Sequence, residues 1–295
     1  MKEFLKRYSL VIGIILMFLL TWPIDLANAG LLPFQVPFVI YIFLGWGFIF
    51  ASLIMTGLTL GREAVINLLK RYLIWRVGWK WYLVAFLLIP FISVIGIYLN
   101  AALTQMPIDF SSVLAYQIFG SSANLLLLII PFFLFDAIAN GEEMGWRGYV
   151  LPRLQARYSA LVASLILGVI WGIWHTPKFL SNWDTLVFAL FMVETLAKAV
   201  LLTWMYNGTK GSLLLVTLFH ASFNTAGVFL PMANTVTDGR LGERIIISLL
   251  QTLVAVVVVM YAGAERLSRT EPKQIQSDNM GETIDHDRTR LSNPV

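Results

Sequence analysis

The segment WYLVAFLLIPFISVIGIYLNAALTQMP, residues 81–107, runs for 27 residues without an Asp, Glu, Lys or Arg. Such a run crosses a bilayer as an α-helix, because about 20 apolar residues span the hydrocarbon and lipid cannot satisfy an open backbone. Further charge-free segments occur at residues 9–24, 26–61, 110–135, 158–177 and 211–237. The sequence therefore predicts an all-α, polytopic bundle of transmembrane helices.

The composition of the chain agrees with this fold class. Hydrophobic residues make up 58% of the chain, its mean hydropathy is +0.75, and charged residues make up 13%, against about 25% in soluble domains. The absence of cysteine excludes disulfides and thiolate sites. The net charge of +4 comes without a long basic run, so we expect it to reflect membrane topology and expect no nucleic-acid partner.

The hydrophobic pattern is best divided into eight spans. We place them near residues 9–29, 34–58, 81–103, 115–142, 159–178, 184–206, 211–231 and 245–264. With the N-terminus in the cytoplasm, the inner segments hold 17 Lys and Arg and the outer loops hold three. The positive-inside rule then predicts that both termini are cytoplasmic.

The remaining segments complete the predicted organisation. Residues 1–267 would form one transmembrane domain, and the polar residues 268–295 a disordered tail. Residues 27–29, Ala-Asn-Ala, have the pattern of a signal-peptidase site, but the many later spans favour an uncleaved first helix. Residues 62–81 mix basic and aromatic side chains, which predicts an interfacial helix, with an ordinary basic loop as the alternative.

A small set of ionisable side chains falls inside the predicted spans. Such groups are costly in lipid and usually face the bundle interior or a water-filled cavity. They are Asp136, Glu142, Glu143, Arg147, His175, Glu194, Lys198 and His220. Each is therefore a candidate for function as well as for structural pairing.

The stretch NGEEMGWR, residues 140–147, places two carboxylates side by side. Glu143 and Arg147 are four residues apart, so on a helix they can form an ion pair. Glu142 points about 100° away and is left without that partner. An unpaired carboxylate in a low-dielectric site suits a general base or acid, although a cap at the membrane interface would also explain it.

The two histidines within spans are the next candidates. His175 lies among Trp and Ile, an environment that also fits a core histidine. His220 and Asn224 share one helix face, where they could converge on one atom or form a helix–helix hydrogen bond. Gly141 and Pro177 flank the carboxylate and His175, and both residues favour a local helix break.

Depth along the helices connects these residues. The midpoint of Glu142 and His175 falls between residues 158 and 159, where a basic stretch ends and the next apolar run begins. A hairpin turning there would place both side chains about 20–24 Å from the turn. His220 and Asn224 would lie about 14 and 20 Å deep on a third helix. The four side chains are therefore expected in one layer.

Three motifs in this order resemble the family of CAAX proteases and bacteriocin-processing enzymes (CPBP or ABI), which includes the Ras-converting CAAX endopeptidase. The family patterns are EExxxR, FxxxH and HxxxN. The matching positions here are Glu142, Glu143 and Arg147, then Trp171 and His175, then His220 and Asn224. Trp171 replaces the Phe of the second motif. The resemblance covers residues of about 110–231.

The resemblance implies an intramembrane endopeptidase with defined roles for these residues. Glu142, helped by His175, would deprotonate the attacking water and later donate the proton to the leaving amine. His220 and Asn224 would bind the oxyanion. Glu143 with Arg147 would support the site, and Trp171 would keep a large aromatic beside it.

The sequence leaves two possibilities for a metal cofactor open. The implied scheme needs no metal, and we prefer it because the chain has no H-E-x-x-H pattern. A zinc site with an open position for water is the alternative. Its ligands would be Glu142, His175 and His220.

Other functions and partners follow from the same features. The expected partners are the lipid bilayer, in the cell membrane, and a membrane-anchored peptide or protein, either of the prenylated CAAX type or bacteriocin-like. A non-catalytic immunity or scaffold protein of the same fold is the first alternative, and a transporter the second. The pair Glu194 and Lys198 would stabilise the bundle or grip a substrate backbone or carboxylate.

Overall fold

The computed structural model describes residues 2–120, 124–232 and 241–269, and every regular element in these ranges is a helix. The N-terminal elements are α1 (Lys2–Arg7), α2 (Ser9–Asn28), α3 (Phe38–Ile42), α4 (Trp46–Leu60), α5 (Arg62–Lys70), η1 (Arg71–Leu73) and α6 (Trp79–Thr104). The middle elements are η2 (Phe110–Ser112), α7 (Leu114–Phe119), α8 (Leu125–Ala139), η3 (Met144–Val150), α9 (Leu151–Gln155) and α10 (Ala160–Trp174). The last are α11 (Pro177–Leu180), α12 (Thr185–Gly208), α13 (Leu213–Phe229) and α14 (Leu241–Ala262). The predicted all-α class is confirmed.

Four helices are long and apolar enough to cross a membrane within the described residues: α2, α6, α12 and α14. The pair formed by α8 and Met144–Gln155 also passes this test, but it is bent by 42°. Three shorter apolar helices, α4, α10 and α13, fill the remaining predicted spans. The bundle is thus of the polytopic membrane type, while the number of eight spans stays a prediction.

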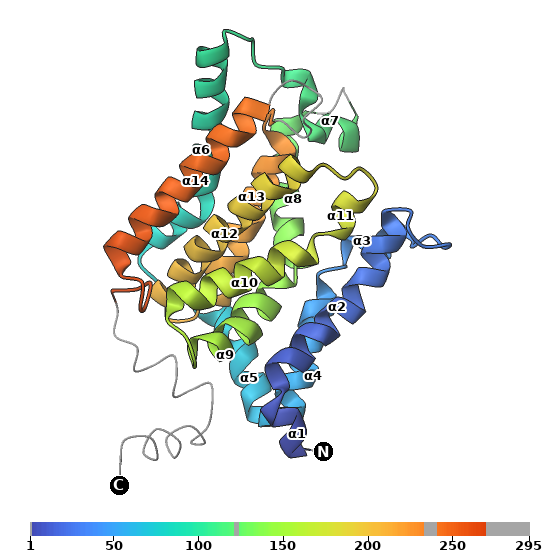
Figure 1. Ribbon diagram of the computed structural model, residues 1–295, viewed down its shortest axis with the longest axis vertical. Helices are drawn as coiled ribbons and strands as arrows, with labels where there is room; N and C mark the ends of the chain where they lie inside the picture. The colour runs from blue at the N-terminus through green and yellow to red at the C-terminus, as the bar shows by residue number, and fades with distance from the viewer. Residues whose placement is uncertain (1, 121–123, 233–240, 270–295) are drawn as a thin grey trace.

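The helices pack around α13. This helix contacts α6, α8, α12 and η3, and its side chains from Leu213 to Ala226 are largely buried. Figure 1 shows α12 beside α10, with α14 and α6 side by side along one edge. A residue in the middle of α13, such as His220, is therefore at the centre of the molecule.

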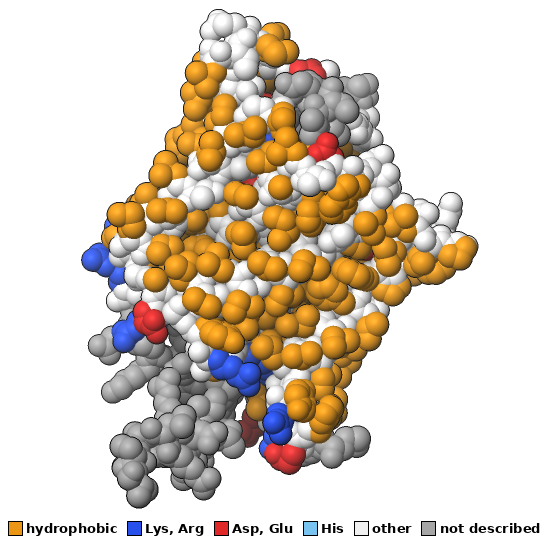
Figure 2. Space-filling view, in the orientation of Figure 1, with side chains coloured by type: hydrophobic (Ala, Val, Ile, Leu, Met, Phe, Trp, Pro, Cys, Tyr) orange, Lys and Arg blue, Asp and Glu red, His pale blue; other side chains and the backbone are white. Residues whose placement is uncertain are grey.

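The surface supports a membrane setting. Figure 2 shows hydrophobic side chains over most of the visible face and Lys and Arg side chains gathered toward the end where α1 lies. The C-terminal end of α14 points to the same end as α1 (Figure 1). The cytoplasmic location of both termini stays a prediction.

The structure divides three predicted segments. The expected helix 115–142 is split into α7 and α8, and it ends at Ala139 rather than at Glu142. The segment 34–58 is split into α3 and α4, and the interfacial segment 62–81 is helical only to Leu73 before α6 begins at Trp79. Exposed Trp75 and Trp79 flank this unwound stretch, as expected at a headgroup region. The predicted tail lies outside the described residues beyond Arg269.

Candidate active site

The chain breaks between α8 and η3, and this break positions Glu142. Asn140 has an extended conformation, and its side-chain Oδ1 accepts a hydrogen bond from the Glu142 backbone N–H at 3.0 Å. A Cβ on Gly141 would lie 2.4 Å from the carbonyl oxygen of Gly45, so only glycine fits at this close approach. The predicted break at Gly141 is confirmed, and Glu142 starts a new helical segment.

That segment continues as a π-helix, η3. π-helical turns are rare and occur often at functional sites. Trp146 and Arg147 lie within η3, and both side chains are completely buried. The ring of Trp146 packs on Phe48 of α4 at a centroid distance of 4.7 Å, which fixes η3 against the N-terminal half of the bundle.

The carboxylate of Glu142 is held by one of its two oxygens. Oε2 accepts hydrogen bonds from the indole Nε1 of Trp171 at 2.8 Å and from that of Trp146 at 3.3 Å. Oε1 lies 4.0 Å from Nε2 of His220. This separation is too long for a direct hydrogen bond, and it suits a bridging water. Glu142 is 8% exposed, so the carboxylate is sheltered without being sealed.

Glu143 links two buried partners. Its Oε1 accepts hydrogen bonds from Nη1 of Arg147 at 2.9 Å and from Nδ1 of His220 at 2.7 Å. The predicted Glu143–Arg147 pair is confirmed, and both side chains are fully buried. Because Nδ1 of His220 serves Glu143, Nε2 is the ring nitrogen that faces Glu142. Glu143 therefore orients His220 as well as Arg147.

Tyr72 of η1 lies near Glu143 from the connection between α5 and α6. Desolvation raises the pKa of Tyr72 to about 12, and the charge of Glu143 acts in the same direction. The phenol therefore stays protonated at physiological pH.

His175 approaches the site without bonding to Glu142. It forms the C-cap of α10, its Nδ1 lies 2.9 Å from the carbonyl oxygen of Trp171, and its ring packs between Trp174 and Phe191. Among the described residues, no hydrogen bond joins His175 to Glu142. The hairpin that was expected to pair them is present, with its turn at residues 156–159. The direct partner of Glu142 on α10 is Trp171, one turn before His175.

Asn224 has a partner on α8. Its Nδ2 lies 3.2 and 3.4 Å from the two carboxylate oxygens of Asp136. Of the two arrangements that the sequence left open for His220 and Asn224, the structure shows hydrogen bonds between helical segments, because each side chain is held by a different carboxylate. Asp136, a candidate for structural pairing from its charge within an apolar segment, is the partner of Asn224.

Trp171 does more than fill space. Its ring lies below the guanidinium of Arg147, with 4.9 Å from Cζ to the centroid, and 5.5 Å from the ring of His220. Its Nε1 supplies the shorter hydrogen bond to Glu142. A Phe at this position would keep the ring contacts but could not donate that hydrogen bond.

The donor set for the alternative zinc site is not assembled. Within the described residues, no group of three or more His, Cys, Asp or Glu side chains is placed to hold a metal ion. Since these residues do not fit a three-ligand site, we derive no step through a metal.

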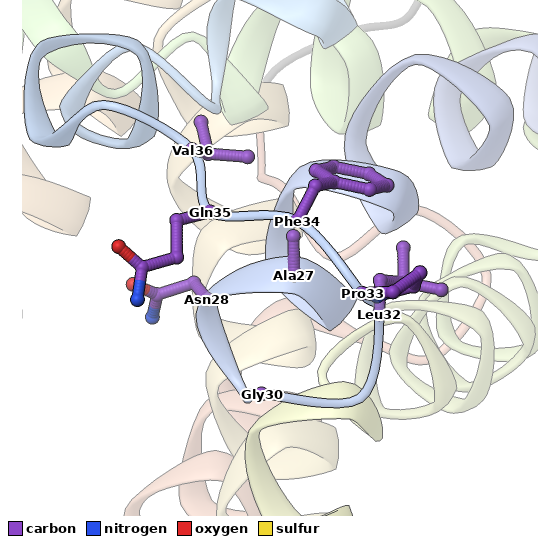
Figure 3. A pocket seen from close by; sticks show the side chains of 8 residues that line it. All are labelled: Ala27, Asn28, Gly30, Leu32, Pro33, Phe34, Gln35 and Val36. Atoms are coloured by element: carbon purple, nitrogen blue, oxygen red, sulfur yellow. The ribbon is translucent and has the colours of Figure 1, made fainter.

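A cavity of about 670 Å³ lies elsewhere, in the connection from α2 to α3. Its lining residues are Ala27, Asn28, Gly30, Leu32, Pro33, Phe34, Gln35 and Val36. Figure 3 shows the amide side chains of Asn28 and Gln35 close together, with Phe34 over Ala27. None of the residues around Glu142 lines it, so it is separate from the candidate active site.

Comparison with known proteins supports the resemblance drawn from the motifs. Residues 122–226 match the family model of the type II CAAX prenyl endopeptidase Rce1-like proteins. A CAAX prenyl protease 2 of Methanococcus maripaludis is 30% identical over 150 residues, which cover 48% of this chain and 53% of that protein. The chain thus spans about half the length of this curated relative. All seven motif positions lie inside the matched segment, and the resemblance to this family is confirmed.

Proposed function

We propose that this chain is an intramembrane endopeptidase in which Glu142 activates the water that attacks a peptide bond. The observation that carries the proposal is the asymmetric environment of the Glu142 carboxylate. Two indole N–H groups hold Oε2, while Oε1 faces Nε2 of His220 at 4.0 Å in a sheltered position. A general base needs this combination of a fixed orientation and one free oxygen.

The proposed reaction starts with a water between Oε1 of Glu142 and Nε2 of His220. Glu142 takes a proton from this water as its oxygen attacks the carbonyl carbon. The developing oxyanion is stabilised by hydrogen bonds from Nε2 of His220, in its protonated form, and from the amide of Asn224. Glu142 then gives the proton to the leaving amine, and the peptide bond breaks.

The surrounding residues support these steps. Glu143 accepts the Nδ1 hydrogen bond of His220, which keeps Nε2 directed toward Glu142 and stabilises a protonated imidazole. Asn224 would release Asp136 when it turns to the oxyanion. His175, partly exposed at the end of α10, would assist through its remaining nitrogen, Nε2.

The substrate class follows from the setting of the site and from the relative. The bundle is of the membrane type, and the similar archaeal protein is described as a CAAX prenyl protease. We propose a substrate anchored in the same bilayer, with a prenylated CAAX-type C-terminus as the first choice and a bacteriocin-like peptide as the second. The cell membrane is the proposed location. Reconstituted activity that survives verified metal removal would support the metal-free scheme, and activity restored only by Zn²⁺ would refute it.

The decisive test is Glu142→Gln in proteoliposomes with a fluorogenic prenylated peptide. The variant keeps the size and hydrogen-bonding capacity of the side chain but removes the base. We expect kcat to fall by about 10²–10⁴-fold, the usual contribution of general acid–base catalysis. Glu63→Gln, an exposed position on α5, is the matched control. Full cleavage by Glu142→Gln would refute the role of Glu142 as general base, and no cleavage by the unaltered protein would favour a non-catalytic role.

A further inference from the structure

A second polar cluster lies inside the bundle, between α12 and α14. Oε1 of Glu194 accepts a hydrogen bond from the Ser248 hydroxyl at 2.8 Å and lies 3.4 Å from Nε of Arg244. Oε2 of Glu194 lies 3.5 Å from Nζ of Lys198, so the predicted pair is confirmed. One carboxylate thus serves two cations.

Two cations share this carboxylate. Arg244 and Ser248 contact Oε1 of Glu194, while Lys198 approaches Oε2 at 3.5 Å. An ammonium group has three N–H donors, and the carboxylate of Glu194 occupies only part of this capacity. Lys198 can therefore bind a further acceptor.

Lys198 also faces the candidate active site. Its Nζ lies 5.2 Å from the centroid of the Phe223 ring, and the same ring stacks on His220 at a centroid distance of 4.5 Å. His220 in turn lies 4.0 Å from Glu142. Lys198 and His220 therefore share Phe223 as a neighbour.

Exposure distinguishes Lys198 from Arg147, the cation closest to the carboxylates. The Arg147 side chain is 0% exposed and bonded to Glu143, whereas the Lys198 side chain keeps 16% of its surface exposed. Phe223, His175 and Asn224 are also only partly buried. A ligand that enters beside these residues can reach Lys198 but cannot reach Arg147.

We propose that Lys198 binds the C-terminal carboxylate of the peptide substrate, and this inference rests on the proposed function. A CAAX motif ends the chain, so its α-carboxylate lies three residues beyond the modified cysteine. Three extended residues span about 10 Å. Glu142, His220, Phe223 and Lys198 are joined by three short contacts of 4.0, 4.5 and 5.2 Å, so Lys198 is close enough to the proposed base for one short peptide to reach both. The cluster would then select substrates by a free C-terminus.

The expected effect is a preference for a terminal acid over a terminal amide. A carboxylate in an apolar bundle requires a charged hydrogen-bond partner, whereas a neutral amide gains little from a cation. The free energy that a charge-assisted hydrogen bond usually contributes corresponds to a change of about 10- to 100-fold in Kd.

Binding to protein in the Glu142→Gln background tests this without turnover. A fluorescent prenylated peptide with a free carboxylate and the same peptide as its C-terminal amide would be titrated in detergent micelles by anisotropy. We expect the acid to bind about 10- to 100-fold more tightly. Adding Lys198→Met should bring the ratio of the amide Kd to the acid Kd close to one. Lys198→Arg should retain most of the preference for the acid.

The ratio is measured within one preparation, so it does not depend on the fraction of folded protein. Lys198→Gln serves as a second variant if Lys198→Met cannot be purified. Lys178→Met is the matched control, because Lys178 also lies over an aromatic ring, that of Trp174, but is exposed outside the cluster. Three results would each overturn the proposal. They are equal binding of acid and amide by the parent protein, no binding of either peptide, and a preference for the acid that survives the loss of Lys198. Cleavage by the protein with Glu142 intact is scored separately, so failure of the peptidase proposal remains distinguishable.

Discussion

Replacing Trp171 with Phe separates the structural interpretation from the motif-based one. The family pattern has Phe at this position, so the motif alone predicts a neutral change. In the structure, Nε1 of Trp171 donates a buried hydrogen bond of 2.8 Å to Oε2 of Glu142. Trp171→Phe keeps an aromatic ring beneath Arg147 and removes that donor. We therefore expect a loss of activity.

The size of the loss follows from the hydrogen bond that disappears. A hydrogen bond to a charged acceptor contributes about 1.5–3 kcal/mol. Trp146 still holds the same oxygen at 3.3 Å, so the lower part of that range applies. Since about 1.4 kcal/mol corresponds to a tenfold change in rate, kcat/KM should fall by about 10- to 30-fold. The fall should be mainly in kcat, because the lost contact orients the base rather than the substrate.

The assay is peptide cleavage in proteoliposomes, with the amount of folded protein measured by thermal unfolding in detergent. Trp22→Phe is the matched control, because it also removes an indole hydrogen bond, of 2.9 Å to the carbonyl of Trp174. Both variants should lose similar stability, while only Trp171→Phe should lose activity. Equal kcat values for the two variants would refute the role given to the indole of Trp171.

Two further predictions concern the structure around the site. Glu143→Gln should lower the unfolding free energy by about 3–5 kcal/mol, because it leaves the charge of the fully buried Arg147 uncompensated. Adding Arg147→Met should recover much of this loss in thermal unfolding. An unchanged melting temperature for the single variant would contradict the pairing. Gly141→Ala should prevent accumulation of folded protein, because the new Cβ meets the carbonyl of Gly45 at 2.4 Å. Gly227→Ala, where no atom lies within 4 Å of the new Cβ, should be tolerated, and equal yields of the two variants in size-exclusion chromatography would argue against this packing.

Several features of the fold could be predicted because they depend on local chemistry. Charge-free runs of about 20 residues specify transmembrane helices, since lipid offers the backbone no alternative partners. The helix break at Gly141, the turn before Ala160 and the Glu143–Arg147 pair are local in the same sense. Each is set by residues close together in the chain.

The hydrogen-bond partners of the site residues could not be predicted from the sequence. Depth along a helix indicated that Glu142, His175 and His220 share a layer, but not which way each side chain turns. The structure gives Glu142 the indole of Trp171 and gives His220 the carboxylate of Glu143. Asp136 gained a partner in Asn224 only because α8 and α13 pack together.

The sequence by itself determined the membrane-type helical class, the family resemblance and the set of candidate residues, because hydrophobicity and motif spacing are properties of short segments. Only the tertiary structure decided which oxygen of Glu142 is held, why His175 is not its hydrogen-bond partner, and that Lys198 and His220 both contact Phe223. The physical reason is the packing of helices from distant parts of the chain. It fixes side-chain rotamers and polar contacts that helix periodicity leaves open.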